Sequence, residues 1–167
     1  MLVDAELMRA DATLLGRYHD GLDALDGLDG AELLALNTDV RTLGACLARE
    51  KIQLGVNLTK GLGSGGDPEL GHQAVLEAED QIRASIKGRR IVFLCTGLGG
   101  GTGSGAAPIV TRIAREEGAF VVVFATMPFA FEGRRRSVQA ESGIQKLKER
   151  VLSCLQCGLL GEFHFAQ

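Results

Sequence analysis

The chain has 167 residues, of which 46% are hydrophobic and 23% charged, and its formal net charge is −3. This length can bury a core of its own, and the composition is ordinary for a soluble globular domain. The negative balance gives no electrostatic reason to expect nucleic acid or an anionic membrane as a partner. No apolar stretch is long enough to span a bilayer, so we expect no direct membrane insertion.

The first half of the chain predicts short, alternating elements. Residues 1–25 look helical in composition, turn signals follow at Gly27 and Gly30, and no first strand stands out. A helix is expected to begin at Asp67 and Pro68, an N-cap acid followed by a first-turn proline, and to end at Gly88. The other expected elements are a buried strand over 31–39, a short helix over 40–50, a short strand over 51–55 and a glycine-rich loop over 58–71.

Two continuous apolar runs, residues 90–96 and 119–126, have the length of strands. Strands buried on both faces have this composition, which is typical of parallel sheets. Apolar residues at helical spacing predict a helix after each run. The stripes are Ala106, Ile109, Val110, Ile113 and Ala114 in the first helix, and Ala140, Ile144, Leu147, Val151 and Cys154 in the second. This alternation predicts an α/β fold, with an open, mostly parallel sheet and helices on both faces.

The four cysteines are Cys46, Cys95, Cys154 and Cys157. The last two form a lone C-x-x-C pair, whereas a structural zinc site needs about four ligands. No second pair of cysteines and no paired histidine is present, so we expect no metal site and interpret both thiols as part of the last helix. The spacing of the histidines gives no reason to expect a nucleophile–histidine pair, and no catalytic residue is predicted.

The sequence GLGGGTGSG (97–105) holds six glycines in nine positions, between an expected strand and an expected helix. In open parallel sheets, ligands bind outside the carboxyl ends of the strands, and the free amides at a helix N-terminus attract anions. Glycine lets a phosphate approach that backbone closely. The loop therefore predicts a cradle for a di- or triphosphate, but it is not a P-loop, because the required lysine is absent.

A dinucleotide fingerprint, G-x-G-x-x-A, fits Gly101, Gly103 and Ala106, and it keeps an NAD-binding oxidoreductase as an alternative. That fingerprint also requires an acid at the end of the next strand, where it binds the ribose hydroxyls. The next expected strand ends at Thr126, and the nearest acid beyond it is Glu132, in a loop. The position of that acid disfavours NAD.

Four segments resemble the tubulin/FtsZ family, in the family's order: LALNTDV, then KIQLG with LTKGLGSGGDPELG, then GLGGGTGSGAAP, then PFAFEGRRR. The resemblance covers about residues 27–150, and we interpret residues 1–167 as a single, incomplete nucleotide-binding domain. It implies GTP and GDP as ligands, with Mg²⁺ possible, and GTP-dependent filament assembly with hydrolysis at subunit interfaces. It also implies a cytoplasmic protein at the cell-division site, whose partners are full-length subunits of the family or copies of itself.

The resemblance assigns site residues as well. The phosphates would be held by backbone amides and hydroxyls of one glycine loop: Gly99, Gly100, Gly101, Thr102, Gly103 and Ser104. An earlier glycine loop would close over them: Gly63, Ser64, Gly65 and Gly66. Glu132 would accept hydrogen bonds from the ribose, and Arg136 would reach toward the sugar or base. The alternative for Arg134, Arg135 and Arg136 is a solvated charged run, although cations are slightly unfavourable at a helix N-terminus.

Two features of the family lack a counterpart in the sequence. The family carries a further glycine loop after its first strand, where this chain offers only Gly16 and Gly21 in LLGRYHDGL. Beyond LKERV the family has a central helix and an acidic catalytic loop, which the tail LSCLQCGLLGEFHFAQ does not resemble. We therefore expect no hydrolysis by this chain alone. A truncated, non-catalytic relative that modulates filaments or fails to join them stays open as an alternative.

Overall fold

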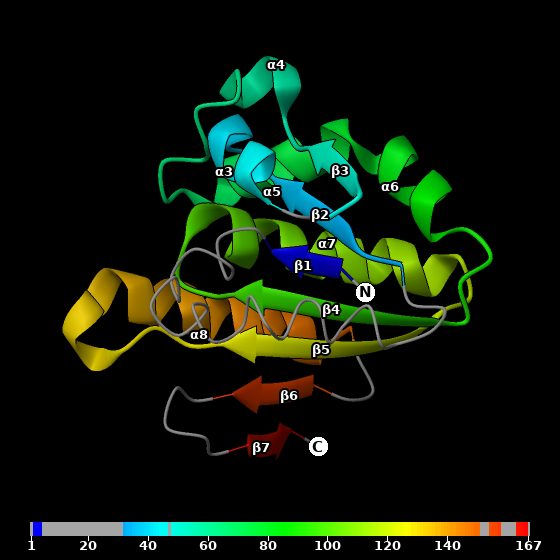
Figure 1. The fold of residues 1–167 in the computed structure, drawn as a ribbon. Coiled ribbons are helices and arrows are strands. Elements are labelled where there is room, and N and C mark those ends of the chain that lie inside the picture. The colour runs from blue at the N-terminus through cyan, green and yellow to red at the C-terminus, as the bar shows by residue number, and fades with distance from the viewer. Residues whose placement is uncertain (1, 5–31, 47, 151–153, 158–162, 167) are drawn as a thin grey trace.

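The computed structural model describes residues 2–4, 32–46, 48–150, 154–157 and 163–166, which form one open sheet with flanking helices (Figure 1). The described strands are β1 (Leu2–Asp4), β2 (Leu34–Asn37), β3 (Glu50–Gln53), β4 (Ile91–Gly97), β5 (Phe120–Thr126), β6 (Cys154–Cys157) and β7 (Phe163–Ala166). Their order in the sheet is β3-β2-β1-β4-β5-β6-β7. Neighbouring strands run parallel, except that β7 is antiparallel to β6. The predicted α/β fold is confirmed.

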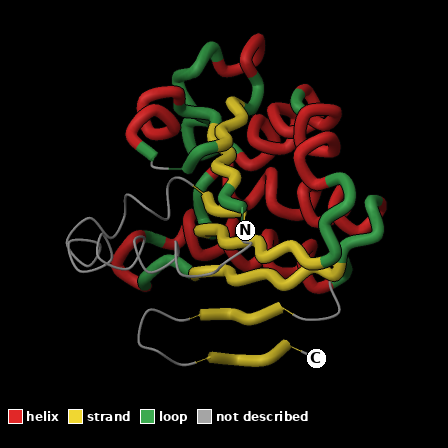
Figure 2. The backbone as a smooth tube through the Cα atoms, turned by 45° about the vertical axis from the view of Figure 1, so that its right-hand side comes forward, coloured by secondary structure: helices red, strands yellow, loops and turns green. Residues whose placement is uncertain are grey.

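The described helices lie on both faces of the sheet. They are α3 (Val40–Ala45), α4 (Val56–Thr59), α5 (Pro68–Glu77), α6 (Glu79–Ile86), α7 (Gly101–Glu116) and α8 (Arg134–Lys148), with a 3-10 turn η1 (Ala130–Glu132). Leu34 and Leu36 of β2 belong to the large core that α5 to α8 share, whereas Ala35 clusters with Leu43 of α3. Since successive strand residues point to opposite faces, α3 covers one face and α5 to α8 the other. Figure 2 shows most of the helices on one side of the strands.

Among the residues that the structure describes, those of β4 and β5 are buried on one face and exposed or half-buried on the other, which corrects the prediction that both faces are buried. Val92 and Val121 are buried, whereas Ile91, Phe93 and Phe120 are 56%, 41% and 51% exposed. The crossovers α7 and α8 step in the same direction across the sheet, from β4 to β5 to β6. Because such crossovers are right-handed, both helices fall on the same face, and the exposed apolar residues lie outside this helix layer.

Helices α5 and α7 pack so closely that their contact has room for glycine but not for a larger residue. A Cβ added to Gly105 of α7 would lie 2.7 Å from the amide nitrogen of His72. One added to Gly71 of α5 would lie 2.9 Å from the carbonyl carbon of Gly101, and real Cβ atoms essentially never show contacts under 3.0 Å. These glycines therefore serve helix packing, and they hold the start of α5 against the start of α7.

The predicted helix at the end of the chain is too long. It ends at Lys148, and Cys154 and Cys157 lie in β6, so the interpretation of these thiols as helical is wrong. The edge of β5 offers unpaired backbone groups, and residues 154–157 pair with it in parallel over Val123–Thr126. Sheet pairing thus overrides the helical spacing. Val151 lies outside the described residues.

Other boundaries also differ from those predicted. The first strand, β1, spans only three residues, too few for an apolar pattern to show. The helix predicted over 40–50 ends at Ala45, and the one predicted over 67–88 is divided at Ala78 into α5 and α6. Residues 5–31, which include Gly16 and Gly21, lie outside the described residues. Within the described ranges, no helix is long and apolar enough to cross a membrane.

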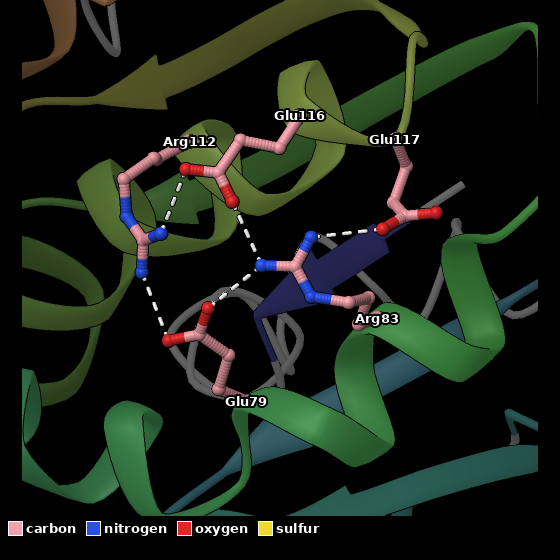
Figure 3. A network of polar contacts seen from close by, with 5 residues as sticks. All are labelled: Glu79, Arg83, Arg112, Glu116 and Glu117. Atoms are coloured by element: carbon pink, nitrogen blue, oxygen red, sulfur yellow. Dashed lines mark hydrogen bonds and ion pairs between the residues drawn. The ribbon is translucent and has the colours of Figure 1, made fainter.

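Ion pairs tie α6 to the C-terminal end of α7 (Figure 3). Arg83 of α6 contacts Glu79 at 2.8 Å, Glu116 at 2.7 Å and Glu117 at 2.8 Å. Arg112 of α7 contacts Glu79 at 2.9 Å and Glu116 at 2.8 Å. Hydrogen bonds from the two arginines lower the pKa of both Glu79 and Glu116. The larger effect comes from Arg112 at Glu79 and from Arg83 at Glu116. The network fixes α6 and α7 at the end of α7 opposite its glycine-rich start.

Candidate functional site

The order of the strands reverses next to β1 (Figure 1). From β1 the chain steps to β2 and β3 on one side, whereas β4, β5 and β6 follow on the other side. In open parallel sheets, ligands bind in the crevice outside the carboxyl ends of the strands at such a reversal. The strands there end at Asp4, Asn37 and Gly97. The segments that follow β2 and β4 therefore frame the candidate site.

Helix α7 begins at this edge with a glycine-rich turn. Its N-cap, Gly100, has no side chain to cap the helix. The first-turn amides of Gly101, Thr102 and Gly103 therefore have no partner within the helix. They lie at the end where the helix dipole places partial positive charge, which favours an anion. The glycine-rich segment 97–105 thus lies where β4 ends and α7 begins, at the carboxyl edge of the sheet as predicted, but residues 98–100 alone form the loop and residues 101–105 already belong to α7.

Three buried hydroxyl groups from three separate segments meet at the start of α7. The Oγ1 atoms of Thr38 and Thr102 are 2.7 Å apart, and Oγ of Ser64 lies 3.1 Å from Oγ1 of Thr102. Thr38 follows β2, and Ser64 belongs to the earlier glycine loop. Thr38, Ser64 and Thr102 are only 1%, 6% and 4% exposed. The hydroxyl bonds therefore fix the earlier glycine loop and the end of β2 against the start of α7.

The earlier glycine loop turns through backbone conformations that favour glycine. Gly63, Gly65 and Gly66 have φ values of 87°, 59° and 75°, in the left-handed region. A Cβ on Gly65 or Gly66 would meet nothing within 4 Å, so conformation and not space requires glycine at these two positions. Ser64 turns its hydroxyl inward. Nε2 of Gln139, on α8, donates to the carbonyl oxygen of Gly66 at 3.0 Å, which links this loop to α8.

The glycine-rich segment 97–105 contacts the segment that follows β5. Within residues 97–105, the amide of Gly99 donates to Oγ of Ser104 at 2.8 Å. A Cβ on Gly99, whose φ is 95°, would lie 2.9 Å from the carbonyl oxygen of Arg136 and 3.1 Å from Cγ of Pro128. This close approach places the first turn of α8 beside the start of α7.

Glu132 of η1 forms an ion pair with Arg136 of the first turn of α8. Nη1 of Arg136 donates to Oε2 of Glu132 at 2.6 Å, and the amide of Phe129 donates to Oε1 at 2.7 Å. Each carboxylate oxygen has a further lone pair, so Glu132 can accept additional hydrogen bonds. The side chain of Arg136 is 49% exposed, and Arg134 and Arg135 are exposed beside it. The two residues predicted to contact the sugar thus contact each other.

Asp39 follows Thr38 directly and caps α3. Its Oδ1 accepts hydrogen bonds from the amides of Arg41 and Thr42, and Nη2 of Arg41 lies 3.2 Å from Oδ2. The hydrogen bonds from Arg41, the side-chain one foremost, lower the pKa of Asp39. This carboxylate is therefore occupied as a helix cap. In the part of the chain that the structure describes, no three His, Cys, Asp or Glu side chains gather as a metal site.

The contacts bring together the three segments that hold the predicted site residues: 63–66, 99–104 and 132–136. Their roles toward a nucleotide stay predictions. Two residues that hold these segments in place, Thr38 and Gln139, are not predicted from the sequence. One sequence feature could have marked Thr38 as a site residue: it is polar and directly follows a buried strand, at the carboxyl edge of the sheet. Gln139 gives no comparable signal, because it is one of many polar residues on α8.

Comparison with known proteins agrees with this arrangement. The model of the Tubulin/FtsZ family, GTPase domain, matches residues 25–156. The FtsZ dimer of M. jannaschii is 39% identical in sequence, with a TM-score of 0.78 over 81% of this chain and 39% of that chain. A GTPγS-bound protofilament of CetZ2 from Haloferax volcanii is 26% identical, with a TM-score of 0.75 over 83% of this chain and 43% of that one. CetZ from Methanosaeta thermophila, at 20% identity and a TM-score of 0.72, shares the fold over 95% of this chain and 44% of that one.

The chain thus spans about two fifths of the length of these relatives. The family match covers most of the chain and includes the four segments whose motifs carry the resemblance. The sheet, the glycine-rich start of α7 and the identity to FtsZ all agree. The chain belongs to the tubulin/FtsZ family, and residues 25–156 match its GTPase domain.

Proposed function

We propose that this chain binds guanine nucleotide at the carboxyl edge of its sheet, as an FtsZ-like protein of cell division. The observation that carries the proposal is the buried, uncapped start of α7, where Thr38 and Ser64 meet Thr102. Free amides at a helix N-terminus suit phosphate groups. Support also comes from the 39% identity to FtsZ of M. jannaschii and from the likeness to a GTPγS-bound CetZ2 protofilament.

In this proposal the phosphates lie against the first turn of α7. The amides of residues 101–103 and the hydroxyls of Thr102 and Ser104 would face them, and the loop over 63–66 would close from the other side. The ribose would extend toward Glu132, whose carboxylate has lone pairs left to accept from sugar hydroxyls. Arg136 would then turn from Glu132 toward the sugar or base.

Mg²⁺ would bind together with the nucleotide. This ion usually keeps several waters and binds one or two carboxylates together with substrate phosphates. The described residues around the start of α7 offer hydroxyls such as Thr102 and Ser64, and no cluster of carboxylates. They fit an ion that is held mainly by phosphate oxygens and water, and such an ion would neutralise part of the phosphate charge.

We further propose GTP-dependent self-association into filaments, in the cytoplasm and at the division site. FtsZ of M. jannaschii was solved as a dimer and CetZ2 as a protofilament. Hydrolysis at subunit interfaces, which the resemblance implies, is proposed for assembled subunits. Sedimentation of a full-length FtsZ with and without this chain tests the proposal. Co-sedimentation that depends on GTP supports it, and a chain that stays in the supernatant and leaves the pellet unchanged contradicts it.

Calorimetric titration of the full chain tests nucleotide binding itself. GTP and GDP are expected to bind at one site, and ATP and NADH are expected to give no comparable heat. Thr102→Val should weaken GDP binding about tenfold, the effect of losing one hydrogen bond of about 1.4 kcal/mol. Thr111→Val is the matched control, because Thr111 is a buried threonine of the same helix whose hydroxyl has no partner among the described residues. Binding of NADH in place of GDP would instead support the oxidoreductase alternative.

A further inference from the structure

We propose that Thr38 is a positioning residue that holds both glycine loops in the geometry in which they receive phosphate. The inference rests on the proposed nucleotide site, but Thr38 itself is not among the residues that would contact the nucleotide. It acts through Thr102 and Ser64, by linking them to the end of β2. The structure supports this role through both the backbone and the side chain of Thr38.

The backbone carbonyl of Thr38 holds the base of the earlier glycine loop. It accepts hydrogen bonds from Oγ1 of Thr59 and from the amide of Gly63, each at 3.2 Å. Gly63 is one of the left-handed residues of this loop, with φ at 87°. One carbonyl at the end of a buried strand therefore fixes where the loop leaves α4 and where it turns toward α7.

The side-chain hydroxyl of Thr38 forms a hydrogen bond to the start of α7. Its Oγ1 lies 2.7 Å from Oγ1 of Thr102, and Ser64 bonds to the same Thr102 oxygen from the loop. Thr38 thus bonds the loop with its carbonyl and the helix with its hydroxyl, while Ser64 bonds the loop directly to the helix. With the residue 1% exposed, water does not compete for these bonds. The loop and the helix start are therefore linked twice, directly through Ser64 and through Thr38 at the end of β2.

The three hydroxyls of Thr38, Ser64 and Thr102 together can offer one hydrogen-bond donor to a ligand. Three hydroxyls carry three protons, and the two bonds that join Thr38, Thr102 and Ser64 use two of them. In the described part of the chain these hydroxyls make no further bond, so one O–H donor is left over, and it is that of Thr102 when Thr38 and Ser64 both donate to Thr102. A buried donor without an acceptor is costly. A phosphate oxygen at the start of α7 would be such an acceptor.

Thr38→Val tests the role, because valine keeps the branched shape and replaces the hydroxyl with a methyl group. Binding of GDP, measured by calorimetry on the full chain, is expected to weaken about tenfold, as for one lost hydrogen bond. Thr38→Ser restores the hydroxyl and should bind within about twofold of the unmodified chain. Thr111→Val removes a buried hydroxyl that has no hydrogen-bond partner among the described residues, and it should also leave binding within about twofold.

Two further measurements separate positioning from general damage. Ser64→Ala should weaken binding about tenfold, and the Thr38→Val, Ser64→Ala double variant should lose far less than the hundredfold expected for independent residues. Amide hydrogen exchange without nucleotide should speed up about tenfold at Gly63 in Thr38→Val and stay unchanged in Thr111→Val. Should Thr38→Val fail to fold, the same exchange at Gly63 is measured in Ser64→Ala.

The outcomes distinguish this inference from the proposed function. If the unmodified chain binds GDP and Thr38→Val binds it equally well, with unchanged exchange at Gly63, the role of Thr38 is wrong while the nucleotide site stands. If the unmodified chain binds no GDP, the proposed function fails. Even in that case, faster amide exchange at Gly63 in Thr38→Val would still support Thr38 as the residue that positions the loop.

Discussion

Gly101, the first residue of α7, lies against the backbone of Asp67, the N-cap of α5. A Cβ on Gly101 would lie 2.6 Å from the amide nitrogen of Asp67 and would also meet Oγ of Ser64. Gly101 therefore has two tasks: its amide belongs to the free first turn of α7, and its missing side chain admits the loop that carries Ser64. The packing of the two helices and the shape of the candidate site depend on the same residue.

Gly101→Ala is expected to destabilise the chain by about 1–3 kcal/mol, because the added methyl group must displace backbone and not a flexible side chain. Urea unfolding followed by circular dichroism measures the change. Gly44→Ala is the control: Gly44 also lies in a helix, α3, but a Cβ there would meet nothing within 4 Å. That control should be neutral or slightly stabilising. Equal losses for both variants would contradict the packing role of Gly101.

Gly65 allows a test of backbone conformation alone. Its φ is 59° and the space around its Cα is open, so any cost of substitution comes from the left-handed conformation. Gly65→Val should cost about 1–3 kcal/mol of unfolding free energy or release the loop. Gly65→Asn should cost much less, because asparagine tolerates this conformation. Urea unfolding of the two variants decides the matter, and equal stabilities would show that the loop does not hold Gly65 in this conformation.

The sequence predicts the sheet and the position of the glycine-rich segment 97–105 because both leave strong local patterns. The apolar runs of β4 and β5 and the six glycines of 97–105 depend on few other parts of the chain. The exposure of Phe93 does not follow from its run, since it depends on which face the crossover helices cover. Cys154 shows the same limit: its helical spacing is real, yet pairing with the edge of β5 decides its conformation.

The candidate site is predictable where a motif marks it and not where contacts between segments build it. Ser64 and Thr102 lie in glycine-rich motifs, and the sequence identifies both. Their bond joins residues 38 positions apart in the chain, and the bond from Thr38 to Thr102 joins residues 64 positions apart. No local pattern indicates such partners. The role of Thr38 therefore becomes visible only in the folded chain.

Arg136 should matter more for binding than for stability. In its ion pair with Glu132 the Arg136 side chain is 49% exposed, and exposed ion pairs contribute only about 0–1 kcal/mol. Arg136→Ala is expected to leave the unfolding free energy within about 1 kcal/mol and to weaken GDP binding about tenfold, as for one lost hydrogen bond to a ligand. Arg134→Ala, an exposed arginine of the same turn, is the control. If both variants bind GDP as the unmodified chain does, the run 134–136 is a solvated charged surface.

The Arg83 network should make stability depend on pH. Folding lowers the pKa values of Glu79 and Glu116 below their ordinary value of 4.5, so the network contributes above that value. The contribution is lost as the pH falls through the lower folded values. Arg83→Gln should therefore be less stable than the unmodified chain at pH 6, and the difference should shrink by about pH 3 and in 1 M salt.

Lys87→Gln is the matched control for that pH series. Lys87 is an exposed cation at the C-cap of α6 for which no ion pair is found among the described residues. Urea unfolding at a series of pH values compares the two variants. A difference between Arg83→Gln and the unmodified chain that does not change between pH 6 and pH 3 would show that the ion pairs do not stabilise the fold.

The most direct test of the nucleotide site is an amide chemical-shift map of the ¹⁵N-labelled full chain, recorded while GDP is added. The largest shifts are predicted at the amides of residues 101–103 at the start of α7, with further shifts at 63–66, and little change near Arg83 and Glu117 at the other end of that helix. Saturable shifts confined to these loops would confirm that phosphate lies on the start of α7. An unchanged spectrum, or shifts concentrated elsewhere on the sheet, would contradict it.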